Sequence, residues 1–418
     1  MESRPQLLVL ANAPAALFML CGISLVERLL RNAQRLGFRY ATVLTNTVEA
    51  VTAHLSVPSW ARADISLRVE PTNGEALLVR EVREQFAASH NHALIVSAGF
   101  YCDVRLLRAM IEQKTTTLLV DSAPPFRGDL LEAAALLDRS WISQQDDATA
   151  LLDQLASDAT VGRIQSLDAA MQPTYLADLR KHVRPLFFPA PPPALSPLAE
   201  RVVRDAAQNG ALDFPALVHA PIETWLVSHL CQTSITPNQV TFATMVIGLF
   251  VTILYASGHL WFGTALALLV GVMDGVDGKL ARTKVETTEL GKSEHTLDYA
   301  VELSWWTALA YHFHERGGKV RAYSLLGLLI VSDLLGRLAK RSVKRRDGRN
   351  LDDVSAFDRC VRYIGGRRNI YVWIFAFGLT IGNAQGAFIL LCLWAGATAA
   401  VHVLRALQIR FRRPIQRF

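Results

Sequence analysis

Residues 274–282 read Asp-Gly-Val-Asp-Gly-Lys-Leu-Ala-Arg, and they lie where an apolar run meets charged sequence. The apolar run Leu260–Met273 ends at two acidic residues of this stretch, and a second apolar stretch, roughly 291–314, carries Asp298 and Glu302. An acidic side chain near the centre of a bilayer costs roughly 2.5–3.5 kcal/mol on insertion scales, so a membrane protein keeps one there for a functional reason. The stretch therefore predicts a helical membrane domain that contains a polar site.

The spacing of the four acids places them in two pairs. Asp274 and Asp277 are three residues apart, Asp298 and Glu302 are four apart, and each pair therefore shares one face of a helix. Four carboxylates that converge without a counter-charge repel one another, and a divalent cation would remove this repulsion. Oxygen ligands suit Mg²⁺ or Mn²⁺, which usually also hold substrate phosphates. In the alternative interpretation, the acids pair with neighbouring basic residues and only join helices.

The pattern D-x-x-D-G-x-x-A-R, followed by eight residues and a glycine, resembles the signature of the CDP-alcohol phosphotransferase family. This family comprises integral-membrane enzymes of phospholipid and inositol-phosphodiester synthesis. The resemblance implies a reaction in which a substituted phosphate group moves from a CDP-alcohol to an acceptor hydroxyl and CMP leaves. The positions that match the signature are Asp274, Asp277, Gly278, Ala281, Arg282 and Gly291.

The second half of the signature departs from the family pattern. The two further aspartates of the family would fall on His295 and Tyr299. Here an apolar-Asp step occurs three residues later, at Asp298, and Glu302 takes the place of the last aspartate. A second register, with Glu294 and Asp298, stays open. We prefer Asp298 and Glu302, because a glutamate can perform the role of an aspartate.

The resemblance assigns roles to the acidic residues. It implies that Asp274 and Asp277 hold Mg²⁺ (or Mn²⁺) and that Asp298 completes the metal shell from the facing helix. It also implies that Glu302, one turn beyond Asp298, is the general base for the acceptor hydroxyl, a role that contributes typically about 10²–10⁴-fold in rate.

Five further residues are expected to bind substrate. The resemblance implies that Gly278 and Ala281 allow close approach of the nucleotide and that Arg282 holds a phosphate oxygen with its planar guanidinium. Arg367 and Arg368 stand near where family members place basic residues for the phosphate of the acceptor. The same two arginines also fit a purely topological role at a membrane surface.

The second half of the sequence predicts six membrane-spanning helices. Thr236 followed by Pro237 is a typical helix start. Basic residues flank alternate loops, and cytoplasmic loops of membrane proteins are rich in Lys and Arg. We therefore expect a multi-pass protein of the inner or plasma membrane whose N-terminal domain and acidic site are cytoplasmic. The expected spans, each long enough to cross a core of about 30 Å, are roughly 239–257, 260–280, 291–314, 320–339, 368–384 and 386–408.

Composition supports a membrane protein and argues against a nucleic-acid partner. Hydrophobic residues make up 51% of the 418 residues, which is high for a soluble protein, and the net charge is only +6. No basic motif with interleaved aromatic residues is present in the sequence, so binding of nucleic acid is not expected. The expected partners are the CDP-alcohol donor, the hydroxyl acceptor and the lipid bilayer. The family resemblance adds a possible homodimer through the membrane domain.

The first half of the chain predicts a separate α/β domain. Short β-like runs, such as Leu7–Ala11, Ala41–Leu44 and Ala93–Ser97, alternate with helical patterns, which is typical of a mainly parallel sheet. A Pro-rich segment then breaks this alternation. The expected organisation is an α/β domain over 1–183, a linker over 184–197, amphipathic juxtamembrane helices over 198–235 and an all-α, six-helix transmembrane domain over 236–418.

The α/β domain carries a second resemblance. Gly22-Ile-Ser-Leu-Val-Glu-Arg-Leu-Leu30 resembles the G-x-P-L-I-E-R segment of sugar nucleotidyltransferases. The Gly-rich phosphate loop of those enzymes should lie between Ala11 and Gly22, but this sequence has neither a glycine nor a basic residue there. The metal-binding aspartate expected near Val96–Gly99 is also missing. We therefore expect a degenerate nucleotidyltransferase-like domain that is retained for regulation, docking or substrate capture.

Three functional hypotheses follow. The first is a metal-dependent CDP-alcohol phosphotransferase whose donor is CDP-diacylglycerol or a CDP-inositol-like compound. The second is a bifunctional enzyme whose N-terminal domain makes the CDP-alcohol as a cytidylyltransferase. The third is a membrane scaffold in which both domains have lost catalysis.

Overall fold

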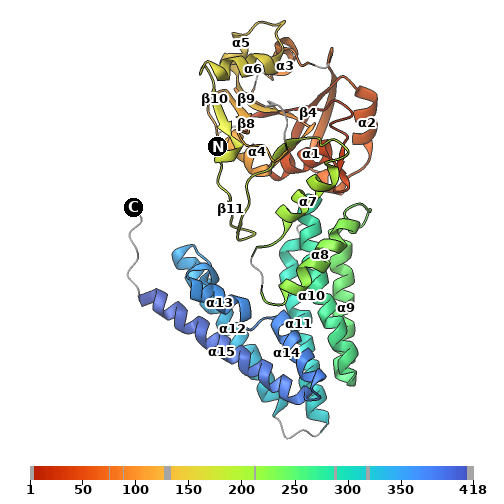
Figure 1. Cartoon of the computed structure of the whole chain (residues 1–418), viewed down its shortest axis with the longest axis vertical. Helices are drawn as coiled ribbons and strands as arrows, with labels where there is room; N and C mark the ends of the chain where they lie inside the picture. The colour runs from red at the N-terminus through yellow and green to blue at the C-terminus, as the bar shows by residue number, and fades with distance from the viewer. Residues whose placement is uncertain are drawn as a thin grey trace. The chain divides into compact units, whose positions relative to one another are not determined.

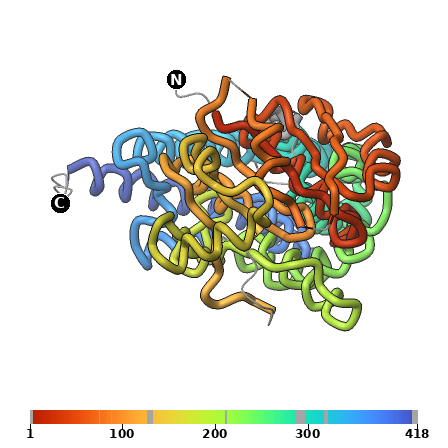
Figure 2. The backbone as a smooth tube through the Cα atoms, turned by 90° about the horizontal axis from the view of Figure 1, so that it is seen from above, coloured from red at the N-terminus to blue at the C-terminus, as the bar shows by residue number. Residues whose placement is uncertain are grey.

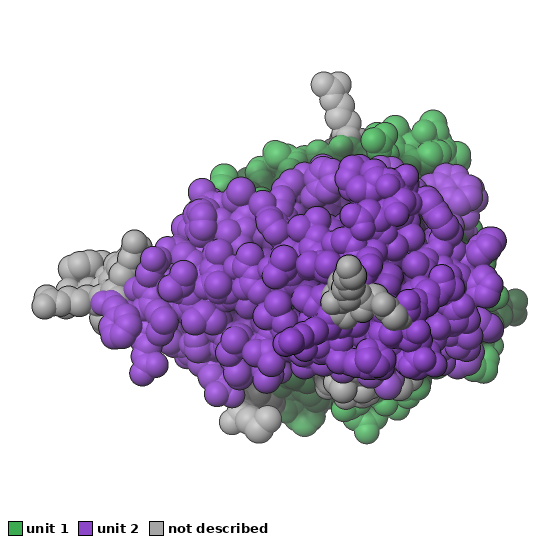
Figure 3. Space-filling view, turned by 90° about the horizontal axis from the view of Figure 1, so that it is seen from below, with its two compact units in different colours: residues 1–210, 230–234, 281–287 green, residues 211–229, 235–280, 288–418 purple. Residues whose placement is uncertain are grey.

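The computed structural model describes residues 4–74, 76–87, 89–126, 133–210, 213–286, 290–316 and 321–411, without the side chains of 290–296. These residues form two compact units (Figure 3). Two short segments from the second half of the chain belong to the N-terminal unit. The N-terminal unit comprises Met1–Gly210, Leu230–Ser234 and Ala281–Thr287, and the helical unit comprises Ala211–His229, Ile235–Leu280 and Thr288–Phe418.

The N-terminal unit is built on a seven-stranded sheet, as the alternation of short apolar runs predicts (Figure 1). All neighbouring strands pair in parallel except β9, which is antiparallel to both β6 and β8. The prediction of a mainly parallel α/β domain is therefore confirmed. In spatial order, the strands are β10 (Gln165–Asp168), β8 (Thr117–Val120), β9 (Ala134–Asp138), β6 (His92–Ser97), β1 (Gln6–Leu10), β4 (Tyr40–Thr45) and β5 (Ser66–Pro71).

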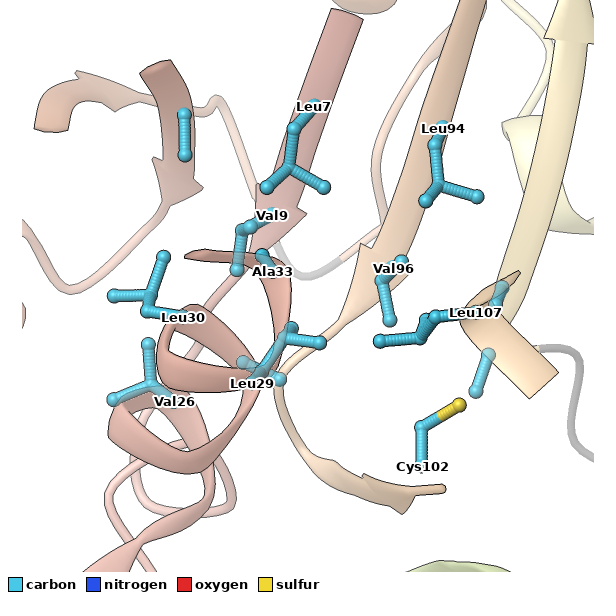
Figure 4. Packing of buried hydrophobic residues seen from close by; sticks show 14 of the residues in the cluster. Leu7, Val9, Val26, Leu29, Leu30, Ala33, Leu94, Val96, Cys102 and Leu107 are labelled. Atoms are coloured by element: carbon cyan, nitrogen blue, oxygen red, sulfur yellow. The ribbon is translucent and has the colours of Figure 1, made fainter. Parts of the chain in front are cut away.

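Helices cover both faces of this sheet. On one face, side chains of β1 and β6 pack against the apolar stripe of α1 and against α4, as Figure 4 shows. On the other face, α3, α5 and α6 pack against side chains that point the opposite way. This alternation follows from the period of two in a strand. The helices of the unit are α1 (Leu25–Arg35), α2 (Val48–Ser56), α3 (Val79–Gln85), α4 (Val104–Ile111), α5 (Arg139–Ser143), α6 (Leu151–Thr160) and α7 (Ser196–Ala207).

Three small antiparallel pairs complete the unit. A tight turn at Cys21 and Gly22, both with positive φ (53° and 77°), joins β2 (Met19–Leu20) to β3 (Ile23–Ser24). Ser24 then caps α1 by accepting a hydrogen bond from the backbone N–H of Glu27. The other pairs are β7 (Phe100–Cys102) with β13 (Phe187–Pro189), and β11 (Tyr175–Leu176) with β12 (Lys181–His182). Part of the Pro-rich segment thus forms a strand of this unit.

The helical unit contains eight α-helices among its described residues. The first long one begins with the predicted cap: Thr236 accepts a hydrogen bond from Gln239 N–H, and Pro237 occupies the first turn. Helix α12 packs along α15, and α9 packs along α11. The helices are α8 (Ala216–Leu230), α9 (Pro237–Ser257), α10 (Leu260–Thr283), α11 (Leu290–Glu315), α12 (Ala322–Asp347), α13 (Ala356–Ile364), α14 (Arg368–Thr380) and α15 (Ala384–Phe411), and the backbone can be followed in Figure 2.

Four of the described helices are long and apolar enough to cross a membrane: α9, α10, α12 and α15. The chain is therefore a multi-pass membrane protein, but two of the six expected spans do not meet these criteria. Helix α14 has only 13 residues, or about 20 Å at 1.5 Å per residue, and it ends at Thr380 instead of 384 because Gly382 turns the chain with φ +73°. Helix α11 is long enough, but acidic and basic residues interrupt its apolar pattern.

Candidate active site

The two acids of the first signature half lie on α10 but differ in environment. The carboxylate of Asp277 is buried and accepts a hydrogen bond from Thr241 Oγ1 on α9 at 2.8 Å. The side chain of Asp274 is 40% exposed, and its Oδ2 lies 2.8 Å from Nη2 of Arg368 at the start of α14. Helix α10 thus presents one carboxylate held by a hydroxyl and one held by a guanidinium.

Arg368 connects both halves of the signature. Besides its ion pair with Asp274, its guanidinium interacts electrostatically with the carboxylates of Asp298 and Glu302 on α11. The structure thus brings these three acids and one predicted substrate-binding arginine into one neighbourhood. Glu302 also accepts a hydrogen bond from Trp306 Nε1 at 3.4 Å, which fixes its carboxylate one turn from the buried tryptophan. In the alternative register, the side chain of Glu294 lies outside the described residues.

A polar pocket of about 340 Å³ opens beside this neighbourhood, between α11, α12, α14 and α15. Glu302 lines it together with both arginines that open the fifth predicted span, Arg367 and Arg368. Four cationic side chains against two acids give its lining a positive character. The charged or titratable residues that line it are Glu302, Asp333, Arg337, Lys340, Arg367, Arg368, Tyr371 and His402.

Asp352 organises the basic side of the pocket. This buried carboxylate, in the turn between α12 and α13, lies 3.0 Å from Nη2 of Arg367, 3.2 Å from Nη1 of Arg362 and 3.2 Å from Nζ of Lys340. We call these four residues the Asp352 cluster. On α12, Asp333 pairs with Arg337 at 2.7 Å, the i,i+4 spacing of two residues in one helix.

The remaining signature residues lie around the end of α10. Gly278 and Ala281 are half-buried, and Arg282 donates a hydrogen bond through Nε to the carbonyl of Ala207 at 2.7 Å. Both partners of that bond belong to the N-terminal unit. Gly291 begins the second signature half on α11, within the part whose side chains the structure does not describe.

Sequence reasoning missed several residues at this site. Lys279 is buried beside the signature acids and donates to Thr224 on α8 at 2.7 Å. Gly275 of α10 lies close to the buried Glu223, also on α8: a Cβ at this glycine would stand 2.3 Å from the carboxylate. Asp352, Lys340 and Arg362 were not singled out, because residues of a basic loop carry no local sign of which acid they surround.

The acids on α10 fit a divalent cation in chemistry and number. Mg²⁺ is usually bound by one or two carboxylates, with waters and substrate phosphates as the other ligands. Asp274 and Asp277 provide two carboxylates three residues apart on one helix, the first of them partly exposed. Within the described part of the chain, no group of three or more His, Cys, Asp or Glu residues is placed to hold a metal ion.

Comparison with known proteins finds curated relatives, similar solved structures and a matching family model. Two curated relatives are each called "Bifunctional IPC transferase and DIPP synthase". The protein from Aquifex aeolicus (strain VF5) is 26% identical over 160 residues, which cover 38% of this chain and 36% of the relative. The protein from Thermococcus kodakarensis is 36% identical over 86 residues, 20% of each chain. The chain thus matches about a third and a fifth of the length of these relatives.

Solved structures similar to this chain match about half of it. They include the inositol-1-phosphate CTP transferase from T. maritima, with a TM-score of 0.35, 10% identity, and coverage of 48% of this chain and 96% of that chain. HddC from Yersinia pseudotuberculosis has a TM-score of 0.35 and 8% identity, and covers 47% of this chain and 98% of that chain.

A family model matches part of the helical unit. The model described as CDP-alcohol phosphatidyltransferase matches residues 234–331, from the cap of α9 into α12. This range contains the D-x-x-D-G-x-x-A-R stretch together with Gly291, Asp298 and Glu302. Residues 234–331 therefore form a CDP-alcohol phosphatidyltransferase domain.

Proposed function

We propose that this protein transfers a substituted phosphate group from a CDP-alcohol to the hydroxyl of an acceptor and releases CMP. The observation that carries the proposal is the meeting of Asp274, Asp298 and Glu302 around Arg368, next to a positively lined pocket. In the reaction, the acceptor oxygen forms a bond to phosphorus, the bond between phosphorus and the CMP oxygen breaks, and the hydroxyl proton passes to a base of the protein.

The donor side uses the signature residues of α10. Asp274 and Asp277 would hold Mg²⁺ or Mn²⁺, with Asp298 as the third carboxylate, and the metal would offset charge on the pyrophosphate and on the leaving phosphate. In the structure, the guanidinium of Arg368 pairs with the carboxylate of Asp274. When donor and metal are bound, the same planar guanidinium can instead bind a phosphate oxygen.

Donor binding also involves the small residues that follow on α10. Gly278 and Ala281 leave room for the backbone to approach the nucleotide. For Arg282, the hydrogen bond to Ala207 occupies only Nε, so the proposed contact to phosphate would use the terminal nitrogens of its guanidinium.

The acceptor side is the polar pocket. Glu302 lines it and is the candidate general base that accepts the proton of the attacking hydroxyl. Arg367 and Arg368 line the same pocket, where they would hold a phosphate on the acceptor and direct its hydroxyl toward the donor. A phosphorylated polyol is therefore the acceptor class that we favour.

In the membrane, we propose six transmembrane segments, with α11 and α14 as the two polar or short ones. Basic segments after α10, α12 and α15 favour a cytoplasmic N-terminal domain and active site. CDP-activated donors are made on that side. A homodimer through the membrane helices is also part of this proposal.

The donor alcohol follows from family context. CDP-diacylglycerol is the donor of the family at large, whereas the fusion to a nucleotidyltransferase-like domain favours a CDP-inositol-like donor. The two relatives named as IPC transferase and DIPP synthase favour the second choice.

We propose that the N-terminal unit has lost nucleotidyl transfer. Asp103, the acid nearest the expected metal position, caps α4 and pairs with Arg105 at 2.8 Å. The segment from Asn12 to Cys21, where a phosphate loop would stand, contains no glycine or basic residue. A bifunctional enzyme is the second candidate, because both relatives are named bifunctional; cytidylyltransferase activity of the full chain would establish it.

The deciding experiment measures CMP release by the purified, Mg²⁺-loaded protein. CDP-diacylglycerol and CDP-inositol are offered with phosphorylated and unphosphorylated polyols, and Asp277→Asn, Glu302→Gln and the matched control Glu315→Gln are compared with the wild type. Glu315 is an exposed acid at the end of the same helix as Glu302. We expect Glu302→Gln to lower kcat by about 10²–10⁴-fold, Asp277→Asn to abolish turnover and Glu315→Gln to change nothing.

The other outcomes each correct a part of the proposal. If Asp277→Asn lost CMP release and Glu302→Gln kept it, the proposed transfer reaction would stand, but Glu302 would not be the base. That result would favour the register with Glu294. No CMP from any pair, together with weak binding of CDP and Mg²⁺, would favour the scaffold hypothesis.

A further inference from the structure

The N-terminal unit buries two arginines of α1 that the proposed chemistry does not use. Arg28 is 2% exposed and Arg31 is 8% exposed. A buried guanidinium is costly unless its donors find partners. In this unit, the partners come from residues 281–286, the described part of the segment that follows the signature acids of α10. We call residues 281–286 the motif loop.

Arg28 binds the backbone of the motif loop. Its Nη1 donates to the carbonyl of Thr283 at 2.8 Å, and its Nη2 donates to the carbonyl of Leu20 at 2.9 Å. The guanidinium also lies over the ring of Tyr101, 5.3 Å from its centroid. Thr283 is fully buried, so this carbonyl has no access to bulk water and depends on a protein donor.

Arg31 binds both the backbone and a side chain of the motif loop. Its Nη1 donates to the carbonyl of Lys284 at 2.9 Å and to Oε1 of Glu286 at 3.0 Å. Its Nε donates to Glu27 on the preceding turn of α1 at 2.8 Å. Glu286 is 6% exposed, so the ion pair is buried and weakly screened by salt.

The motif loop is held in a conformation that it would not adopt alone. Val285 has φ +54°, which is a genuine outlier for a β-branched residue. Such strain persists only where the surroundings fix the backbone, and it concentrates at functional segments. Two further bonds anchor the loop: Lys284 Nζ donates to the carbonyl of Thr233 at 2.7 Å, and Arg282 Nε donates to that of Ala207.

The motif loop lies between the two halves of the signature. It starts four residues after Asp277, contains Arg282 and precedes the helix that carries Asp298 and Glu302. Its backbone path therefore determines where α10 ends, directly after the residues that carry the first pair of signature acids. A small displacement of catalytic groups can lower the rate by about 10²-fold. Interactions that fix the backbone of the motif loop should therefore affect the turnover rate.

We propose that α1 of the N-terminal unit is a clamp for the motif loop, and that Arg28 and Arg31 are positioning residues for the transferase. This inference rests on the proposed function. It assigns a task to a domain that lacks a phosphate loop, because Arg28 belongs to the very segment that resembles sugar nucleotidyltransferases. In this chain, that arginine binds protein carbonyls.

The test compares Arg31→Met, Glu286→Gln and the double variant with the matched control Arg39→Met in the full-length protein. Arg39 is exposed in the same unit and only approaches Asp64, at 3.8 Å. The first readout is amide hydrogen exchange of residues 281–286. We expect faster exchange there in both single variants, no further increase in the double variant, and no change in the control.

The second readout is the kinetics of CMP release. We expect Arg31→Met to lower kcat by about tenfold to 100-fold and also to raise the KM of the donor, because Ala281 and Arg282, which we propose bind the donor, lie in the loop that would loosen. Should Arg31→Met fail to fold, Glu286→Gln tests the same pair from the loop side.

Two results would overturn the clamp: unchanged exchange of residues 281–286 in both single variants, or faster exchange with wild-type kcat. The first would show that α1 does not hold the loop, and the second that holding it has no bearing on turnover. Absence of CMP release by the wild type would count against the transferase, while the exchange comparison would still decide whether α1 holds the loop.

Discussion

Two clusters of cations in this molecule differ in whether they are closed or lie at a pocket. In the clamp of the N-terminal unit, donors of Arg28 and Arg31 are taken up by protein carbonyls and by the carboxylates of Glu27 and Glu286. In the Asp352 cluster of the helical unit, three cations share one carboxylate, and two of them also line a pocket. A closed cluster whose donors meet groups of the protein holds protein segments together, whereas a cluster that lies at a pocket can also bind an anion.

The largest loss of stability is expected in the Asp352 cluster, where three cations contact the same carboxylate. Replacing Asp352 with Asn removes a buried carboxylate that three cations contact and should lower the free energy of unfolding by about 3–5 kcal/mol, since breaking a buried ion pair leaves uncompensated charge. Thermal unfolding of the purified protein measures this cost. Because an anion can replace the lost carboxylate, inorganic phosphate should raise the melting temperature of Asp352→Asn more than that of the wild type.

The control for this prediction is Asp347→Asn, since Asp347 makes only a 3.9 Å contact with Arg346 at the exposed end of α12. It should unfold like the wild type, because exposed pairs contribute about 0–1 kcal/mol. A phosphate effect that is equal in all three proteins would show that the Asp352 cluster does not bind anions.

A smaller effect is expected in the clamp, where each cation has several partners. Arg28→Met removes the hydrogen bonds to Thr283 and Leu20 and leaves two carbonyls without this donor, which should cost about 1–3 kcal/mol. Phosphate should not restore this loss, because the two arginines of the clamp are buried and their hydrogen bonds go to carbonyls and side chains of the protein. Equilibrium unfolding in denaturant, with Arg39→Met as control, measures the loss in the free energy of unfolding. If phosphate restored the stability of Arg28→Met, the clamp would bind anions as well, and the two clusters would not differ in this respect.

The smallest effect concerns acid stability. Burial of Glu27 alone would raise its pKa, but the hydrogen bond and charge of Arg31 and the charge of Arg62 outweigh it and hold the pKa below the ordinary 4.5. A lowered folded-state pKa contributes stability that is present above the ordinary pKa and is lost as the pH falls through the folded value. Glu27→Gln should therefore be less stable than the wild type at pH 7, and the gap should narrow below about pH 4.5.

Unfolding profiles of wild type and Glu27→Gln between pH 7 and the acid limit check this. A gap that is constant with pH would mean that the carboxylate charge of Glu27 does not stabilise the clamp.

Local patterns predicted much of the fold. The strands predicted at Ala41–Leu44 and Ala93–Ser97 are confirmed, because short apolar runs can be recognised from local sequence. The strand Ala134–Asp138 was missed, since its sequence Ala-Ala-Leu-Leu-Asp has no strand-like alternation or β-branched residue.

The site was predictable in its residue types but not in its contacts. The ion pair between Asp274 and Arg368 joins residues 94 positions apart (368 − 274), and no local pattern encodes such a meeting. The attachment of residues 281–287 to the N-terminal unit was equally hidden, because a short polar loop after an apolar helix looks like any membrane turn. Metal ligation and the role of Glu302 stay predictions.

The bond between Arg28 and Thr283 spans 255 positions of the chain, and this distance has a consequence for biosynthesis. At about 5–20 residues per second, a ribosome needs roughly 13–50 s to make the residues between them. The last strand of the sheet ends at Asp168, 92 positions before α10 begins (260 − 168), so the sheet and α1 have roughly 5–18 s to fold in the aqueous compartment before α10 is translated. The motif loop then docks onto a finished surface as the helix before it enters the bilayer, so the order of synthesis makes the N-terminal unit a template for the assembly of the membrane enzyme.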